Sequence, residues 1–270
     1  MATNKTPIPL FKFPAGCVYP REIGDFNFVS GRKACHCKGG QDHGAMLISC
    51  QPKNENKTVL WNCFVAGTFS YNADGKVVLP TQAWSAPFGN KSTEYRAHLD
   101  EKKLWNGCVM AYSAAQFDIV KSNCVDLAEP KNQLITDSSD AAKFLIEGQE
   151  LWLPKKRLSA LSPFFSILFT ADFKEKAEGE YKLDDIKLEE FLHFIGILHC
   201  FDMPIDKSSV EYLLKLADMW QCDLVQQRCK EFLLRTTDVL PMKKLALAYR
   251  YKLPEVLYDT ANRNLTNEAE

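Results

Sequence analysis

The sequence predicts an α+β protein, in which an N-terminal β-sandwich is followed by a mostly helical domain and a short C-terminal helical extension. Two observations support this prediction. From Phe26 to about Val120, short apolar runs alternate with turn clusters, whereas after Asp140 the apolar residues recur with the spacing of a helix. The 270 residues are enough for two domains. The expected parts are an N-terminal segment at 1–25, a β-rich domain at 26–120, a linker at 121–139, a helical domain at 140–235 and the extension at 237–264.

The β-rich part is marked by alternating strands and by turns. Around Trp61, the residues Trp61, Cys63 and Val65 give one apolar face, which is typical of a strand packed in a sandwich. Asp74-Gly75 lies between apolar segments and predicts a hairpin, because both residues tolerate positive φ. Asn106-Gly107 introduces the last expected strand pair.

In the second half, a hairpin is followed by amphipathic helices. Residues 142–147 and 150–153 are expected to pair as strands. Apolar residues between Leu188 and Leu198 share one helical face, and Ser208-x-x-Glu211 predicts a capping box that opens the next helix. Pro254 has a position typical of the first turn of a helix. Core packing explains most of these apolar stripes.

The composition argues against several functional classes. The net charge is −1 and the sequence pI is about 6.5, so the basic excess typical of nucleic-acid or membrane-surface binding is missing. No apolar run approaches the length of a membrane span, and the N-terminus does not resemble a signal peptide. We therefore expect a protein of the cytoplasm or nucleus, whose ten cysteines stay as thiols.

The sequence gives little sign of metal or catalytic chemistry. The cluster Cys35-His36-Cys37, with His43 and Cys50, suggests zinc, but a Cys-x-Cys pair is cramped for one tetrahedral ion. We expect thiols in or near a strand at these positions, with no metal and no cofactor. The sequence shows no phosphate-binding glycine loop, carboxylate pair or marked nucleophile, so we expect no catalytic residues and no enzyme. Three tryptophans could line a peptide groove or pack in the core, namely Trp61, Trp84 and Trp105.

From about Ser139 to Arg235, the chain resembles the BTB domain, also called POZ, over nearly its full length. The resemblance rests on several short pieces in the family's order, and on strands and helices in matching places. One departure is Pro154-Lys155, where the family commonly has His-Lys or His-Arg. The matching pieces are Phe144–Leu151, Lys155-x-x-Leu158 with Ser162-Pro-Phe-Phe165, Leu168-Phe169, Phe173-Lys-Glu175, Leu188–Phe191, Leu213–Asp218 and Arg228–Leu233.

The flanking regions extend this resemblance to the MATH–BTB type of protein. Residues 237–264 look like the helical extension of ubiquitin-ligase adaptors, and the front half is similar to a MATH domain, a β-sandwich that captures substrate peptides. The resemblance implies a non-enzymatic adaptor that bridges protein substrates to the cullin-3 ubiquitin-ligase scaffold. A self-associating or transcription-associated BTB protein that binds no ligase is the alternative.

The resemblance also implies two sets of site residues. Cullin-binding members carry a hydrophobic-x-Glu motif after the second helix, which Phe173-Lys174-Glu175 matches, and a tyrosine at the position of His199. Phe173 would be an exposed anchor and Glu175 a hydrogen-bond acceptor; otherwise Phe173 packs on its own domain and Glu175 is a solvated charge. For a homodimer, Leu158 and Phe165 would pack across a two-fold axis, and Lys155 is the basic residue of the dimer pocket. The alternative is that Leu158 and Phe165 belong to the core of one chain.

Overall fold

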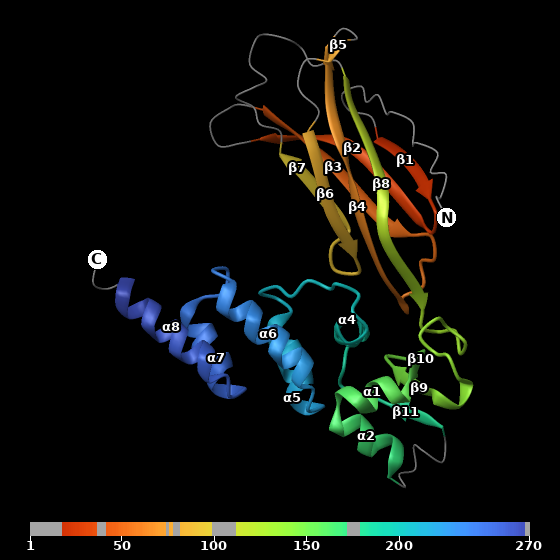
Figure 1. Cartoon of the computed structure of the whole chain (residues 1–270), viewed down its shortest axis with the longest axis vertical. Helices are drawn as coiled ribbons and strands as arrows, with labels where there is room; N and C mark the ends of the chain where they lie inside the picture. The colour runs from red at the N-terminus through yellow and green to blue at the C-terminus, as the bar shows by residue number, and fades with distance from the viewer. Residues whose placement is uncertain are drawn as a thin grey trace, which may run out of the picture. The chain divides into compact units, whose positions relative to one another are not determined.

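The computed structural model describes residues 18–36, 42–73, 76–77, 82–98, 112–171 and 179–267 (Figure 1). These residues fall into two compact units, which are described separately. The N-terminal unit comprises Met1–Glu55 and Trp61–Cys124, and the C-terminal unit comprises Asn56–Leu60 and Val125–Glu270. No helix within the described ranges has both the length and the hydropathy to cross a membrane.

The N-terminal unit contains two sheets of antiparallel strand pairs. The first sheet has the order β1-β2-β3-β7, and the second has the order β5-β4-β6 with β8 paired to β4 (Figure 1). The strands are β1 (Val18–Ile23), β2 (Phe26–His36), β3 (Asp42–Pro52), β4 (Val59–Ala73), β5 (Lys76–Val77), β6 (Gln82–Gly89), β7 (Glu94–His98) and β8 (Tyr112–Asp126).

Aromatic rings from the two sheets meet in a shared core. Phe28 of β2 lies with its ring centroid 6.2 Å from that of Phe88 of β6 and 5.2 Å from that of Phe117 of β8. On β4, Trp61, Cys63 and Val65 are buried, as their alternation predicts. Contacts of this kind confirm the expected β-sandwich.

Strand β8 and the segment after it differ from the expected linker at 121–139. β8 continues to Asp126, whose carboxylate accepts hydrogen bonds from Thr58 Oγ1 and Asn56 Nδ2, both at 2.7 Å. Beyond it, Asn132 is buried and its Nδ2 donates to the carbonyl of Trp152 at 2.9 Å. These bonds attach the polar segment to the C-terminal unit. The segment is therefore a hydrogen-bonded loop of that unit, and its polar side chains supply the donors and acceptors. The domain limits that the sequence predicts, at residues 120, 139 and 235, remain predictions.

The C-terminal unit begins with a small sheet of order β10-β9-β11. Its strands are β9 (Ala141–Ile146), β10 (Gln149–Pro154) and β11 (Glu180–Lys182). Ile146 pairs with Gln149, and the two residues between them, Glu147 and Gly148, have φ values of 47° and 75°. Positive φ at both positions is typical of the tightest hairpins. The expected hairpin is therefore confirmed, with its turn one residue earlier than the position 148–149 that the expected strands imply, whereas the parallel pairing of β11 with β9 was not predicted.

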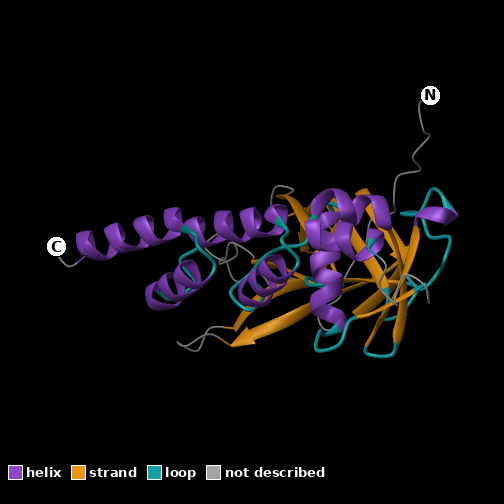
Figure 2. Cartoon of the chain, turned by 90° about the horizontal axis from the view of Figure 1, so that it is seen from below, coloured by secondary structure: helices purple, strands orange, loops and turns teal. Residues whose placement is uncertain are grey.

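The described part of the C-terminal unit also contains seven named α-helices, of which α1 contacts β10, whereas α7 packs on α8 and α8 on α6 (purple in Figure 2). Their shared core is rich in aromatic rings, and the ring centroid of Phe165 lies 6.0 Å from that of Phe144 and 5.3 Å from that of Trp220. Phe191 also contacts Trp220, with centroids 5.8 Å apart. The helices are α1 (Lys155–Leu161), α2 (Pro163–Thr170), α4 (Leu188–Leu198), α5 (Val210–Met219), α6 (Asp223–Arg235), α7 (Pro241–Arg250) and α8 (Pro254–Asn267).

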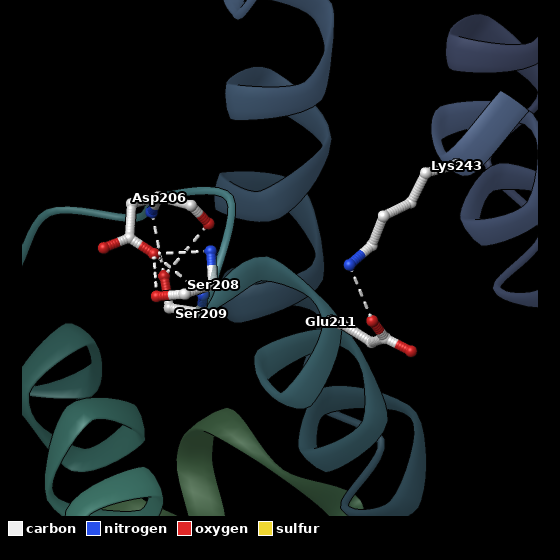
Figure 3. A network of polar contacts seen from close by, with 5 residues as sticks. All are labelled: Asp206, Ser208, Ser209, Glu211 and Lys243. Atoms are coloured by element: carbon white, nitrogen blue, oxygen red, sulfur yellow. Dashed lines mark hydrogen bonds and ion pairs between the residues drawn. The ribbon is translucent and has the colours of Figure 1, made fainter. Parts of the chain in front are cut away.

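The start of α5 corrects one expectation, because the predicted Ser208–Glu211 capping box does not form. The carboxylate of Asp206 accepts from the backbone N–H groups of Ser208 and Ser209, both at 2.8 Å (Figure 3). An ionised acceptor bonds backbone donors more strongly than a hydroxyl does, so Asp206 takes the role expected of Ser208. Glu211 instead reaches Lys243 of α7 at 2.9 Å (Figure 3). That ion pair is exposed and contributes at most about 1 kcal/mol.

Candidate protein-interaction site

The segment expected to bind a cullin, Phe173-Lys174-Glu175, lies outside the described residues. It falls between the end of α2 at Thr170 and the start of β11 at Glu180. α2 starts in a well-defined way, because Ser162 Oγ accepts from the N–H of Phe165 at 3.2 Å and donates to the carbonyl of Trp220 at 2.5 Å. On α2 itself, Ile167 is 57% exposed, although its neighbours in the helix pack on the core. Sequence periodicity did not single out Ile167, since one apolar residue outside a stripe gives no signal.

His199 caps the C-terminus of α4 and is largely covered by the chain. Its N–H donates to the carbonyl of Ile195 at 3.0 Å, and its Nε2 is buried with no hydrogen-bond partner among the described residues. Burial lowers the pKa of His199 to about 4, with a smaller contribution from the positive charge of Arg157. The imidazole is therefore neutral near pH 7. It offers an aromatic edge but no phenol hydroxyl, unlike the tyrosine that the resemblance leads one to expect.

Arg157, which the sequence analysis did not single out, joins α1 to the end of α4. Its Nε and Nη2 donate to the carbonyl of Leu198, at 3.2 and 2.6 Å. A guanidinium at a helix C-terminus satisfies a free carbonyl and balances the helix dipole. This contact fixes the helix end that carries His199.

The residues expected at a dimer interface lie in different environments. Leu158 and Phe165 are both 0% exposed, and Phe165 contacts the rings of the chain's own core. Within this single chain both side chains have the intrachain packing that the sequence left open as an alternative, and their role at a dimer interface stays a prediction. Lys155 is partly exposed, with Nζ 3.5 Å from the carbonyl of Ser139. Nearby, buried Asp140 accepts from the N–H of Lys156 at 2.8 Å, so its carboxylate serves the first turn of α1.

An open groove of about 450 Å³ lies on the C-terminal unit, beside the end of α4 and along α6. Its apolar wall includes Ile197 and Phe232, and its charged side chains are Asp202, Glu231 and two arginines. The opposite charges balance, so the groove does not select for either sign of ligand. Its full lining is Ile197, Cys200, Asp202, Met203, Ile205, Arg228, Glu231, Phe232 and Arg235.

The described residues give no sign of a metal site. Among them, no group of three or more His, Cys, Asp or Glu side chains is placed to hold an ion. Cys50 is fully buried in the sandwich core. The rest of the cluster that suggested zinc lies outside the described side chains. Of the three tryptophans, Trp61 and Trp84 are buried in the core, and Trp105 lies outside the described residues.

Comparison with known proteins agrees with this architecture. Residues 135–237 match the BTB/POZ domain family, so the C-terminal unit contains a BTB/POZ domain followed by α7 and α8. The family match concerns residues 135–237 and does not extend to the rest of the chain.

Relatives of this chain include "BTB and MATH domain-containing protein 38" of Caenorhabditis elegans, 34% identical over 121 residues, which are 45% of this chain and 31% of the relative. "BTB and MATH domain-containing protein 36" of the same species is 31% identical over 109 residues, or 40% and 34% of the two chains. Mouse "Kelch-like protein 23" is 34% identical over 82 residues, covering 30% of this chain and 15% of the relative. The matches thus span about a third or less of these relatives. The domain and the relatives together confirm the resemblance to the MATH–BTB type.

Proposed function

We propose that this chain is a homodimeric adaptor that recruits protein substrates to a cullin-3 type ubiquitin ligase in the cytoplasm or nucleus. The BTB/POZ domain would hold the scaffold, and the N-terminal sandwich would hold substrates. The observation that carries the proposal is the sequence Phe173-Lys174-Glu175, which follows α2 in a chain segment that matches the BTB/POZ family. Proteins of the BTB and MATH type and of the Kelch type among the relatives support an adaptor role.

The chemistry of the expected contact is an apolar anchor beside a charged acceptor. An aromatic side chain that becomes fully desolvated at an interface is a typical hot spot. Glu175 would accept hydrogen bonds from the scaffold, and the neutral ring of His199 would provide a secondary aromatic contact. Ile167 on α2 is also exposed and is an apolar side chain that precedes this segment in the sequence.

Leu158 and Phe165 are enclosed within the single chain, so in this proposal they would support the dimer interface from beneath its surface. Lys155 remains available, since its side chain is partly exposed at the start of α1. Two copies would make the adaptor bivalent, so that two weak substrate contacts reinforce each other.

The test is a binding titration of the full chain against purified cullin-3. Phe173→Ala with Glu175→Ala should weaken binding by about 30-fold or more, because loss of a hot-spot aromatic costs about 2 kcal/mol or more. The matched control is Phe64→Ala with Glu129→Ala, which removes the same two side-chain types from exposed positions outside α1–α4.

Three outcomes separate the possibilities. Selective loss of binding in the 173/175 variant supports the proposal. Equal binding by this variant and the control would show that Phe173 and Glu175 make no contact with the scaffold. Absence of binding by the unmodified chain, with a dimer seen in sedimentation, would overturn the ligase role and favour a self-associating BTB protein.

A further inference from the structure

Two buried cysteines lie on strands of opposite sheets in the N-terminal sandwich. Cys50 belongs to β3 of the first sheet, and Cys63 belongs to β4 of the second sheet. The two residues are 0% and 1% exposed. Both side chains therefore point into the shared core, and neither is on the surface.

The strand registers place these two cysteines at the same level of the core. Cys50 pairs directly with Phe28 of β2, and Cys63 pairs directly with Phe88 of β6. Directly opposed residues in a sheet project to the same face. The rings of Phe28 and Phe88 contact each other edge to face, with centroids 6.2 Å apart. Each cysteine thus stands beside one member of an inter-sheet aromatic contact.

Each of the two thiols also affects the pKa of the other. The hydrogen bond from Cys50 lowers the pKa of Cys63, against the opposing effect of burial. The pKa of Cys50 is raised, first by this hydrogen bond and then by burial. In contrast, Cys229 in the C-terminal unit is equally buried, and burial alone raises its pKa to about 12. Cys63 is therefore the better source of a thiolate, and Cys50 is its proton donor.

We propose that Cys50 and Cys63 form a modification site for hydrogen peroxide, which oxidises them to a disulfide that links the two sheets. The thiolate of Cys63 attacks one peroxide oxygen, the O–O bond breaks, and the leaving hydroxide takes up a proton to become water. The sulfur of Cys50 then attacks the resulting sulfenic acid, and the S–S bond forms as a second water leaves. Two thiols and one peroxide thus give one disulfide and two waters.

The location of the pair selects the oxidant. A fully buried thiol is closed to a bulky disulfide such as oxidised glutathione, whereas peroxide is little larger than water and would reach the pair through local opening of the sandwich. A disulfide between the sheets is compatible with a β-sandwich, since other sandwich folds contain one. Oxidation would join β3 to β4 and so restrict the separation of the sheets.

The experiment uses the full chain, reduced and freed of reductant, with a small excess of hydrogen peroxide. Remaining thiols are alkylated, and the chain is digested without reduction and mapped by mass spectrometry. The expected product is a peptide pair joined through Cys50 and Cys63 and lighter by two hydrogen atoms. Cys229 should remain alkylated as a thiol, and exposed Cys200 reports that the peroxide was active.

Variants test the order of the two steps. In Cys50→Ala, the sulfenic acid on Cys63 has no resolving thiol and should be captured by dimedone. In Cys63→Ala, Cys50 should stay reduced as Cys229 does, because burial alone still raises its pKa. Circular dichroism and the same mapping in urea serve as controls, and the cross-link should lose its selectivity once the sandwich is unfolded.

The proposal fails if Cys50 and Cys63 are recovered as separate thiols while Cys200 is oxidised. It also fails if Cys63 and Cys229 react at the same rate, since burial alone would then explain both, or if the cross-link forms equally well in urea.

Discussion

Gly196 in the middle of α4 lies in a close-packed position of the C-terminal unit. A Cβ atom at this position would lie 2.7 Å from Cγ and 2.8 Å from Cε of Met203, and 3.3 Å from Cδ1 of Leu60. Gly in a helix interior is less favourable than Ala by about 1 kcal/mol. The glycine therefore fits the packing of its neighbours and works against the preference of the helix.

The expected effect of Gly196→Ala is the difference between two terms. The helix gains about 1 kcal/mol, whereas forcing an extra methyl into a packed core typically costs about 1–3 kcal/mol. Met203 is only 9% exposed, so its side chain has little room to move away. We expect a net loss of up to about 2 kcal/mol in the free energy of unfolding. In a Met203→Ala background the shortest contacts disappear, and Gly196→Ala should become stabilising by up to about 1 kcal/mol.

The assay is urea unfolding of the four chains of this double-mutant cycle, followed by far-UV circular dichroism. All named helices of the described residues lie in the C-terminal unit, so the helical signal reports on that unit. The coupling energy between positions 196 and 203 should be about 2 kcal/mol. Its sign should be such that the double variant is more stable than the sum of the two single substitutions predicts. Stabilisation by Gly196→Ala in the unmodified chain would refute the reasoning. A coupling near zero would show that Met203 does not limit the space.

Two further predictions concern the ends of α2 and α4. Ser162→Ala should lower the stability of the C-terminal unit by about 2–4 kcal/mol in urea unfolding, because it removes the cap of α2 and leaves the buried Trp220 carbonyl without its donor. Ser166→Ala on the same helix is the control, and an equal loss there would contradict the capping argument. His199 has a pKa of about 4 in the folded chain, below its value in the unfolded chain, so the unfolded state binds more protons. Stability should therefore fall as the pH drops from about 6.5 to 4, by at most about 1.4 kcal/mol per pH unit, and His199→Gln should remove that component. A pH profile unchanged in His199→Gln would show that this imidazole does not titrate with folding.

The elements that the sequence predicted well are those with a strong local signal. The hairpin around Gly148 has turn residues with positive φ between alternating strands, and the stripe from Leu188 to Leu198 has the period of a helix. The start of α5 was predicted less well, because several acceptors compete for the same backbone donors. Ser208 and Asp206 are both good caps, and only the path of the loop decides which carboxylate or hydroxyl reaches the free N–H groups.

Site residues are harder to predict, because a hydrophobic pattern does not say which chain covers a side chain. Leu158 and Phe165 are apolar at positions that suit either a core or an interface, and the sequence left both possibilities open. In the structure both side chains are buried in the core, where Phe165 contacts Trp220 from a distant part of the chain. Arg157 had no signal of its own, since its role depends on Leu198 lying beside α1. Such long-range contacts are beyond the reach of local periodicity.

At the helical extension, the end of the family match differs from the end of the shared apolar core. The BTB/POZ match ends at residue 237, close to the expected domain end at 235. Yet buried Lys244 of α7 donates from Nζ to the carbonyl of Thr236 at 2.5 Å, which satisfies the C-terminus of α6. Lys230 of α6 also pairs with Glu255 of α8 at 3.0 Å. Residues of α7 and α8 belong to the same apolar cluster as the sheet and α1–α6, so cutting the chain between α6 and α7 would expose core surface of the BTB/POZ domain. The extension therefore shares the apolar core of the BTB/POZ domain, although the family match ends at residue 237. The apolar core residues in question are Val239, Leu247, Ala248, Tyr251, Leu253 and Val256.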